Sequence, residues 1–223
     1  MNTAKIVAIT NPLIKGVDTA SDFIAYAARV SNPSNQMNTE TSERLLRYCA
    51  KHAHWSVFEM SNVVMEIETT RDIARQILRH RSFSFQEFSQ RYADPTKELG
   101  FTTREARLQD NKNRQNSIEV DDESLQNEWY RAQQRVLFAV EREFKWAMEN
   151  GIAKEQARAL LPEGLTVSRM YMNGNIRSWI HYCQLRMTEG TQKEHREVAA
   201  SAWNQLAQYF RFVTTINNNQ LKD

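Results

Sequence analysis

Cysteine, long apolar runs and net charge are scarce in this chain of 223 residues, and each shortage excludes a class of protein. Only Cys49 and Cys183 are present, without a CxxC pair, so a disulfide framework is excluded and a reducing cytoplasm is expected. No apolar run approaches the roughly twenty residues of a membrane span and no signal peptide opens the chain, so we expect no membrane association. No repeat or linker divides the sequence, which predicts a single domain over residues 1–223.

The net charge of +2 excludes a strategy of bulk electrostatic attraction to a polyanion. A hydrophobic content of 41% and a charged content of 25% are ordinary for a globular protein, and the length suffices for a core. Any binding of an anion must therefore come from a local cluster of basic residues.

Residues 79–91 (RHRSFSFQEFSQR) form such a cluster, with three arginines, a histidine, three serines and a glutamate. Arginine is suited to planar, bidentate recognition of a phosphate or the edge of a heterocycle. The serines and the carboxylate can orient a sugar or a base through hydrogen bonds. The cluster predicts an anion pocket with aromatic packing behind it, and a basic surface loop is the alternative.

Periodicity and turn residues predict strands and helices around one polar excursion. Strands are expected over 5–10, 62–69 and 165–172, with Gly174 ending the last one. Helices are expected over 21 or 22–30, 41–53, 70–78, 121 or 122–150, 154–161, 175–187 and 191–216, the last opened by a capping box at 191–194. Residues 94–120 are polar and irregular, which predicts a mobile loop beside the site, and 217–220 form a polar tail.

Three details of these helices bear on function. Gln76 and Arg79 fall three apart, so we expect them to project together from one helical face. The long helix ending near 150 carries an apolar stripe that predicts a core or a subunit interface rather than a cofactor site. His52 and His54 invite a metal interpretation, which we reject because no third ligand stands at zinc-like spacing.

A second polar group lies at 175–186 (NIRSWIHYCQLR). Arg177 and His181 are four apart, as are Tyr182 and Arg186, so two polar ridges run between apolar positions. By itself this pattern is also typical of the exposed face of an amphipathic helix.

The order Arg79-His80-Arg81, Ser84, Ser89, Arg91 resembles the R-H-R-x-x-S-x-x-x-x-S-x-R signature of the flavin-dependent thymidylate synthases. The resemblance extends over about 54–186, with a histidine at 54, an A-R-x-x-L-P element at 157–162 and an N-x-R-S helix at 175–186. Departures from the family are Ser56 for a frequent threonine, Gln86 for an asparagine, and His181 for an asparagine that contacts flavin.

The resemblance implies an α+β fold with a mixed sheet and long flanking helices, assembled as a homotetramer whose sites combine several subunits. It implies conversion of dUMP to dTMP, with 5,10-methylenetetrahydrofolate as the carbon donor and FAD reduced by NADPH as the hydride source. It further implies hydride delivery without a cysteine nucleophile, and the sequence offers only Cys49 and Cys183 for that role.

The resemblance also assigns residues. Arg186 is expected to be catalytic, stabilising negative charge on the pyrimidine, and His54 is expected near the flavin and the folate. The residues expected to bind dUMP are Gln76, Arg79, Glu87, Ser89, Arg91, Arg158 and Arg186. Those expected to bind FAD are Ser56, Arg79, His80, Arg81, Glu87, Asn175, Arg177 and His181. No metal is expected.

Two rival functions remain open from the residues alone. Arginines interleaved with Phe83, Phe85 and Phe88 could stack on and neutralise single-stranded RNA, although the low net charge argues against nucleic acid as a partner. A different flavoenzyme on the same scaffold is the second rival.

Overall fold

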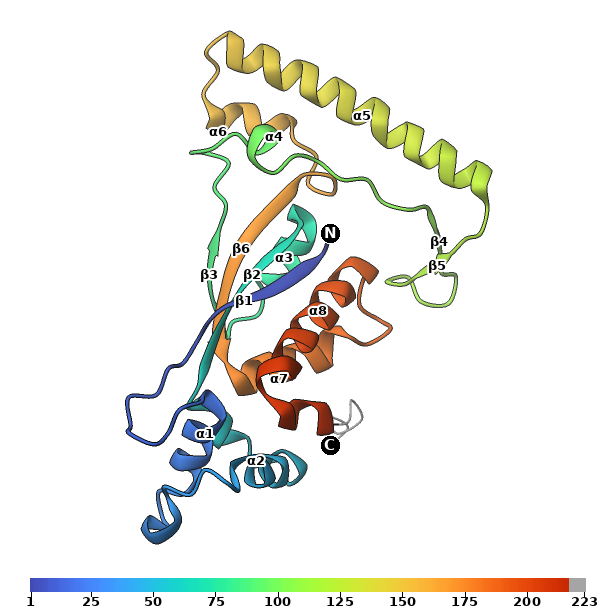
Figure 1. Cartoon of the computed structure of the whole chain (residues 1–223). Coiled ribbons are helices and arrows are strands. Elements are labelled where there is room, and N and C mark those ends of the chain that lie inside the picture. Colours follow the sequence, from blue (N-terminus) through green and yellow to red (C-terminus); the bar gives the residue numbers. More distant parts are fainter. Residues whose placement is uncertain (217–223) are drawn as a thin grey trace.

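An antiparallel four-stranded sheet organises the computed structural model, which describes residues 1–216, so the tail expected over 217–220 lies outside it (Figure 1). In spatial order the strands are β1 (Thr3–Ile9), β2 (Asn62–Thr70), β6 (Val167–Asn175) and β3 (Ser84–Glu87). β2 and β6 pair along their full length, whereas β1 and β3 are the edges. The expected α+β fold is confirmed, but the expected mixed sheet is not, because each described pairing is antiparallel.

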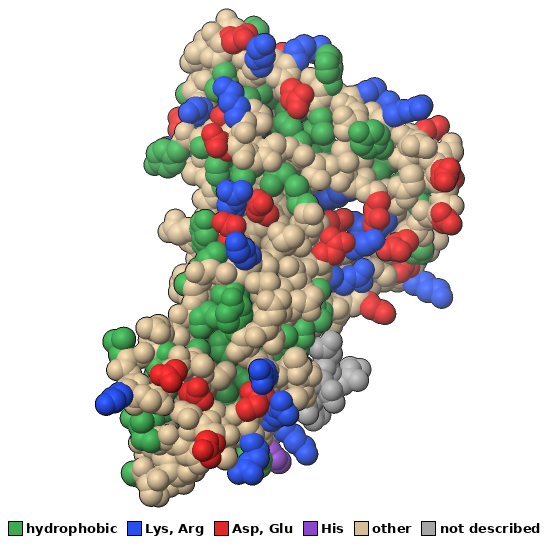
Figure 2. Space-filling view, viewed as in Figure 1, with side chains coloured by type: hydrophobic (Ala, Val, Ile, Leu, Met, Phe, Trp, Pro, Cys, Tyr) green, Lys and Arg blue, Asp and Glu red, His purple; other side chains and the backbone are tan. Residues whose placement is uncertain are grey.

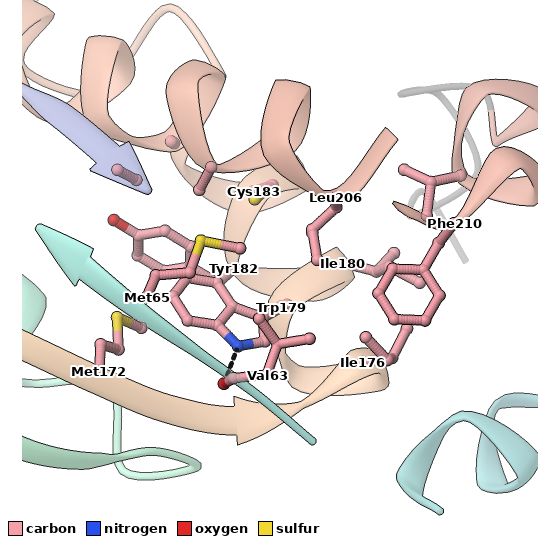
Figure 3. Close-up of a cluster of buried hydrophobic side chains, with 14 of the residues drawn as sticks. Val63, Met65, Met172, Ile176, Trp179, Ile180, Tyr182, Cys183, Leu206 and Phe210 are labelled. Carbon is pink, nitrogen blue, oxygen red and sulfur yellow. Dashed lines mark hydrogen bonds between the residues drawn. The ribbon is translucent and has the colours of Figure 1, made fainter. Parts of the chain in front are cut away.

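The two faces of the sheet differ in character. Val63, Met65 and Ile67 alternate with half-buried residues along β2 and face α7 (Ile176–Arg186) and α8 (Lys193–Tyr209) (Figure 3). Between them Trp179 is fully buried, and its Nε1–H donates to the carbonyl of Val63 at 3.0 Å. This side of the sheet holds the core.

The other face of the sheet is polar. Glu66 accepts a hydrogen bond from the Tyr171 hydroxyl at 2.8 Å, and Glu68 forms an ion pair with Arg169 at 3.0 Å. Tyr171 remains 43% exposed. Such cross-strand pairs stabilise the polar face of the sheet.

Gly174 lies within β6 and does not end the strand, so that part of the sequence prediction is wrong. A Cβ at this position would lie 2.3 Å from the ring of Phe83. The glycine therefore permits a close approach of the backbone to an aromatic ring, which is a common reason for glycine inside a strand.

Helix boundaries follow local capping. Thr19 accepts a hydrogen bond from the Asp22 N–H and so begins α1 (Ala20–Ala28) slightly before the expected start. Asp122, one of the two predicted starts, caps the long α5 (Glu123–Glu149). The Thr191–Glu194 capping box is wrong because Gln192 is the residue before α8 and makes no side-chain cap. α8 ends at Tyr209, and the final turn is a separate 3₁₀ helix, η4 (Arg211–Thr215).

The remaining elements have the following bounds: α1 Ala20–Ala28, η1 Pro33–Asn35, α2 Ser42–Lys51, η2 Trp55–Glu59, α3 Arg71–Ile77, α4 Pro95–Glu98, β4 Arg107–Gln109, β5 Ser117–Glu119, α5 Glu123–Glu149, α6 Lys154–Ala157 and η3 Arg158–Leu160. The helix expected over 154–161 is thus split into a short α-helix and a 3₁₀ turn. No helix within residues 1–216 is long and apolar enough to cross a membrane.

Residues 94–149, which we call the arm, are more ordered than the irregular loop predicted for 94–120. They contain α4, a two-stranded hairpin of β4 and β5, and the 27-residue α5, about 40 Å long at 1.5 Å per residue. Figure 1 shows α5 crossing above the sheet, away from α7 and α8. Only the last turns of its apolar stripe, at Phe144 and Ala147, enter a small core with Ala157 and Leu161.

Candidate functional site

The Arg79–Arg81 triplet lies in the connection between α3 and β3. Arg79 and Arg81 are exposed, and within residues 1–216 neither is paired with a carboxylate. Arginines without an internal counter-ion are available for an external anion. The signature begins at the end of a helix, as predicted, since α3 ends at Ile77.

His80, between these two arginines, joins the triplet to α7. Its Nε2 accepts a hydrogen bond from the Nε–H of Arg186 at 2.9 Å. Burial, with the positive charges of Arg186 and Arg79, lowers the pKa of His80 to about 4. His80 is therefore a neutral imidazole with its proton on Nδ1, because Nε2 must act as an acceptor.

Arg186 ends α7, where the negative end of the helix dipole favours a cation. His80 occupies its Nε–H, and no ion pair with a carboxylate is formed to its guanidinium anywhere in the described chain. The outer edge of the guanidinium thus keeps its planar fork of donors. Such a group can contact the edge of a pyrimidine and stabilise negative charge there.

Gln76 and Arg79 differ in their surroundings. Its amide points toward α8, where its Nε2 donates to Gln192 Oε1 at 2.8 Å and its Oε1 lies 3.2 Å from His195 Nδ1. Arg79 follows the end of α3 and is exposed. α3 ends at Ile77, between the two residues.

Glu87, at the end of β3, is already held by its own chain. Ser168 donates to it at 2.8 Å, and Arg71 and Arg75 approach its two oxygens at 3.5 and 3.4 Å. This carboxylate sits opposite Met170 on β6. The contacts fix its orientation but use part of its accepting capacity.

Ser89, Arg91 and Arg158 lie beyond β3, near α6. Arg91 forms an exposed ion pair with Glu155 at 3.2 Å, and its backbone N–H donates to Ser89 Oγ at 3.4 Å. Arg158 is exposed at the junction of α6 and η3. An ion pair this exposed contributes little, so Arg91 can exchange its partner for a phosphate.

Part of the set assigned to flavin lies where β6 passes into α7, beside η2, namely Ser56, Asn175, Arg177 and His181. Asn175 caps α7 by accepting the Ser178 N–H at 2.8 Å, and Arg177 is paired with Glu59. His54 and Ser56 are exposed, and the His54 ring lies 6.0 Å from that of Tyr48.

His181 completes this group. Its ring lies 4.9 Å from Trp55 in an edge arrangement, and its buried Nε2 has no hydrogen-bond partner within the described part of the chain. Burial and the nearby Arg177 lower the pKa of this imidazole. A buried ring nitrogen without a partner is a group that a ligand can satisfy.

The expected site residues thus fall into three groups. The first group consists of Gln76, His80 and Arg186. The second group lies at the end of β3, and the third lies at the start of α7. No hydrogen bond or ion pair between residues 1 and 216 joins the groups.

The sequence assigned no functional role to two residues of this region. His195 and Tyr182 are buried, and their rings hydrogen-bond at 3.1 Å between His195 Nε2 and the Tyr182 hydroxyl. His195 also contacts Gln76, 119 positions earlier in the chain. No local spacing could have revealed a contact over that separation.

The RNA interpretation finds no support on the face that Figure 2 shows, where acidic and basic side chains are interspersed. A surface for single-stranded nucleic acid presents a continuous basic track with aromatic platforms. Phe83 is buried and packs on Trp179 at 4.9 Å between ring centroids, so it forms part of the core.

Comparison with known proteins identifies the family. The family described as "Thymidylate synthase complementing protein" (Thy1) matches residues 12–210. A probable flavin-dependent thymidylate synthase of Paramecium bursaria Chlorella virus 1 is 50% identical over 198 residues, covering 88% of this chain and 90% of the relative. The flavin-dependent thymidylate synthase of Synechocystis sp. is 48% identical over 201 residues, covering 89% and 91%.

A solved structure shares the fold. The UMP/dUMP methylase PolB from Streptomyces cacaoi, bound with 5-Br UMP, superposes with a TM-score of 0.78 at 23% identity, covering 97% of this chain and 93% of its own. The order of elements, the signature over 79–91 and the identity to both relatives agree, and the chain belongs to the thymidylate synthase complementing protein family, that of the flavin-dependent thymidylate synthases.

Proposed function

We propose that this chain is a flavin-dependent thymidylate synthase that converts dUMP to dTMP, with 5,10-methylenetetrahydrofolate as carbon donor and FAD reduced by NADPH as hydride source. The observation that carries the proposal is the contact between Arg186 and His80. A neutral histidine holds the Nε–H of the arginine and leaves the outer donors of its guanidinium without a carboxylate partner.

Arg186 addresses the chemical difficulty of the reaction, which is that C5 of uracil is a poor nucleophile. Carbon C5 becomes reactive when negative charge can build on N3 and on the carbonyl oxygens of the ring. A fixed guanidinium beside N3 and O2 favours that charged form, because a nearby cation lowers the pKa of an acidic group.

The other dUMP residues bind the nucleotide. Arg79 and Arg158 are exposed and supply cations for its phosphate, with Ser89 as a hydroxyl donor. Arg91 joins them once it leaves Glu155. Gln76 contacts the base, and Glu87, held by Arg71 and Arg75, is oriented toward the sugar.

The residues at the start of α7 fit a flavin with a diphosphate. The N–H groups at the first turn of α7 and the exposed Arg79 and Arg81 suit negative phosphates, and the free Nε2 of His181 suits a polar ring atom. The set of flavin-binding residues is completed by Arg177, Asn175, Ser56 and His80. His54 lies toward the folate. When bound, the flavin supplies the hydride chemistry, and the protein supplies placement and electrostatics.

We infer that the complete site forms in a homotetramer. No hydrogen bond or ion pair within residues 1–216 joins the three groups of site residues. In addition, β3 is an open edge, and α5 exposes large apolar side chains. Aromatic side chains exposed together are typical of an interface with another copy. Two buried free thiols, Cys49 and Cys183, support a reducing cytoplasm as the compartment.

The absorbance spectrum of the purified protein tests the proposal. We expect flavin absorbance that dUMP perturbs, and formation of dTMP when dUMP, methylenetetrahydrofolate and NADPH are added. A colourless protein that takes up no FAD, or one that binds FAD and forms no dTMP, contradicts the proposed function.

A further inference from the structure

A line of hydrogen bonds runs through the interior from the start of α8 to Tyr182 on α7. It passes from Glu194 to Gln192, Gln76, His195 and the Tyr182 hydroxyl, with donor–acceptor distances of 2.9, 2.8, 3.2 and 3.1 Å. His195 is fully buried and Tyr182 is 2% exposed. Figure 3 shows Tyr182 beside Met65, inside the core.

The direction of every bond in this line is set by its first member. Although burial acts to raise the pKa of Glu194, hydrogen bonds from Arg107 and its neighbours bring that pKa below its usual value. Glu194 is therefore a carboxylate, which can only accept. The amide nitrogen of Gln192 must donate to it, so the amide oxygen of Gln192 faces Gln76.

The same logic continues to the histidine. Gln76 donates through Nε2, so its Oε1 faces His195 and requires a donor there. His195 must carry its proton on Nδ1, and its Nε2 then accepts from the Tyr182 hydroxyl. Burial raises the pKa of Tyr182 well above its usual value, so the phenol keeps the proton that it donates.

We propose that His195 is a positioning residue which, as the Nδ1–H tautomer, holds the amide of Gln76 together with Gln192 and so determines which Gln76 atoms are left to meet the pyrimidine. One N–H and one oxygen lone pair of Gln76 remain free, in a fixed arrangement. Without these bonds the amide of Gln76 could rotate by half a turn, which would exchange the positions of its N–H and its oxygen. The proposal rests on the proposed function only in naming a pyrimidine nucleotide as the ligand.

Tyr182 also connects His195 to Arg186, through His80. The ring of Tyr182 packs edge-on against His80 at 4.9 Å between centroids, and His80 accepts from Arg186. His195 thus stands between the two side chains expected to read the base. Burial, with the charges of Arg186 and His80, lowers the pKa of His195 to about 3, so its tautomer persists at neutral pH.

Two variants separate positioning from mere packing. In His195→Asn the side-chain amide reaches the place of Nδ1 and can still donate to Gln76, whereas in His195→Gln it reaches the place of Nε2 and can serve only Tyr182. We expect His195→Asn to keep the KM for dUMP within about threefold and His195→Gln to raise it about tenfold. Ser201→Ala, which removes another partly buried hydrogen bond of α8, is the control and should leave KM unchanged.

A packing role predicts that the two variants change KM alike, and equal KM values in folded Asn and Gln variants would overturn the proposal. Flavin content and the unfolding midpoint of each variant establish that it is folded.

A measurement on the unaltered protein needs no variant. Nitrogen NMR of the protein labelled at its five histidines should show, besides His181 with its lowered pKa, two imidazoles that stay neutral down to about pH 5 with the proton on Nδ1, those of His80 and His195. A spectrum with no such second imidazole contradicts the proposal. If the protein forms no dTMP the proposed function fails, while this spectrum still decides the tautomer of His195.

Discussion

The same kinds of aromatic residue lie in opposite environments in two regions of this chain. In the region of the sheet with α7 and α8, Trp179, Tyr182 and Phe210 are at most 2% exposed. In the arm, Phe138 on α5 is 69% exposed and Trp146 is 56% exposed. The sheet region completes its core within one chain, whereas the arm does not.

The contacts that attach the arm explain the difference. Gln133 of α5 exchanges two hydrogen bonds of 2.8 Å with the backbone of Arg104, and Gln126 does the same with Ala106 at 2.7 and 3.0 Å. These polar bonds fix the path of the chain but bury little apolar area, which is the main source of stability. The arm therefore has a defined shape and an unsatisfied apolar surface.

Substitution of a tryptophan in each region tests this comparison most strongly. Trp179→Ala should lower the free energy of unfolding by about 3–5 kcal/mol, because it leaves a cavity and removes the donor to Val63. Trp146→Ala should change it by about 0.5 kcal/mol or less in the separated subunit. Urea unfolding measures both, and similar losses in the two variants would contradict the division into regions.

The second prediction separates chemistry from stability within the sheet region. Arg186→Lys and Arg186→Ala should both reduce dTMP formation by about 100-fold or more, because a lysine lacks the planar fork of donors. Reduction of the flavin by NADPH and the unfolding midpoint should be retained. A Lys variant that forms dTMP at close to the original rate would remove Arg186 from its assigned role.

The third prediction concerns the exposed surface of the arm. Phe138→Glu should yield smaller assemblies, measured by light scattering, and should lower dTMP formation because the site draws on several copies. Gln134→Glu adds the same charge at an exposed polar position of α5 and is the matched control. An assembly of unchanged mass in the Phe138 variant would argue against α5 as an interface.

The fourth prediction uses the buried histidines. His80 and His195 have pKa values of about 4 and 3, below the ordinary 6.5, so below pH 6.5 the unfolded chain takes up protons that the folded chain does not. Their stabilising effect is complete above that pH and is lost as the pH falls through the folded values, by up to about 1.4 kcal/mol per pH unit for each histidine. His195→Asn should lessen the decline of unfolding free energy between about pH 6 and 4, and an unchanged slope would be the contrary result.

The smallest effect is expected for the thiols. Burial raises the pKa values of Cys183 and Cys49, so neither forms the thiolate that a nucleophile requires. The double variant Cys49→Ala, Cys183→Ala should keep dTMP synthesis, with a modest loss of stability. If the folded variant binds FAD and dUMP but forms no dTMP, the mechanism without a protein nucleophile is wrong.

Local features of this protein were determined by its sequence alone. The caps at Asp122 and Asn175 define the starts of α5 and α7, since a capping side chain acts on an N–H three residues away. The order of residues over 79–91 and 175–186 identifies the family. These signals are short in range, so they can be read from spacing.

Only the tertiary structure decided the contacts that join distant segments. Phe83 packs closely on Gly174 in β6, and Gln76 bonds to Gln192 and His195 near the start of α8. Hydrogen bonds between residues more than 100 positions apart depend on how the sheet and helices pack. The spacing of residues along the chain carries no record of that packing, so the tautomer of His195 could not be predicted.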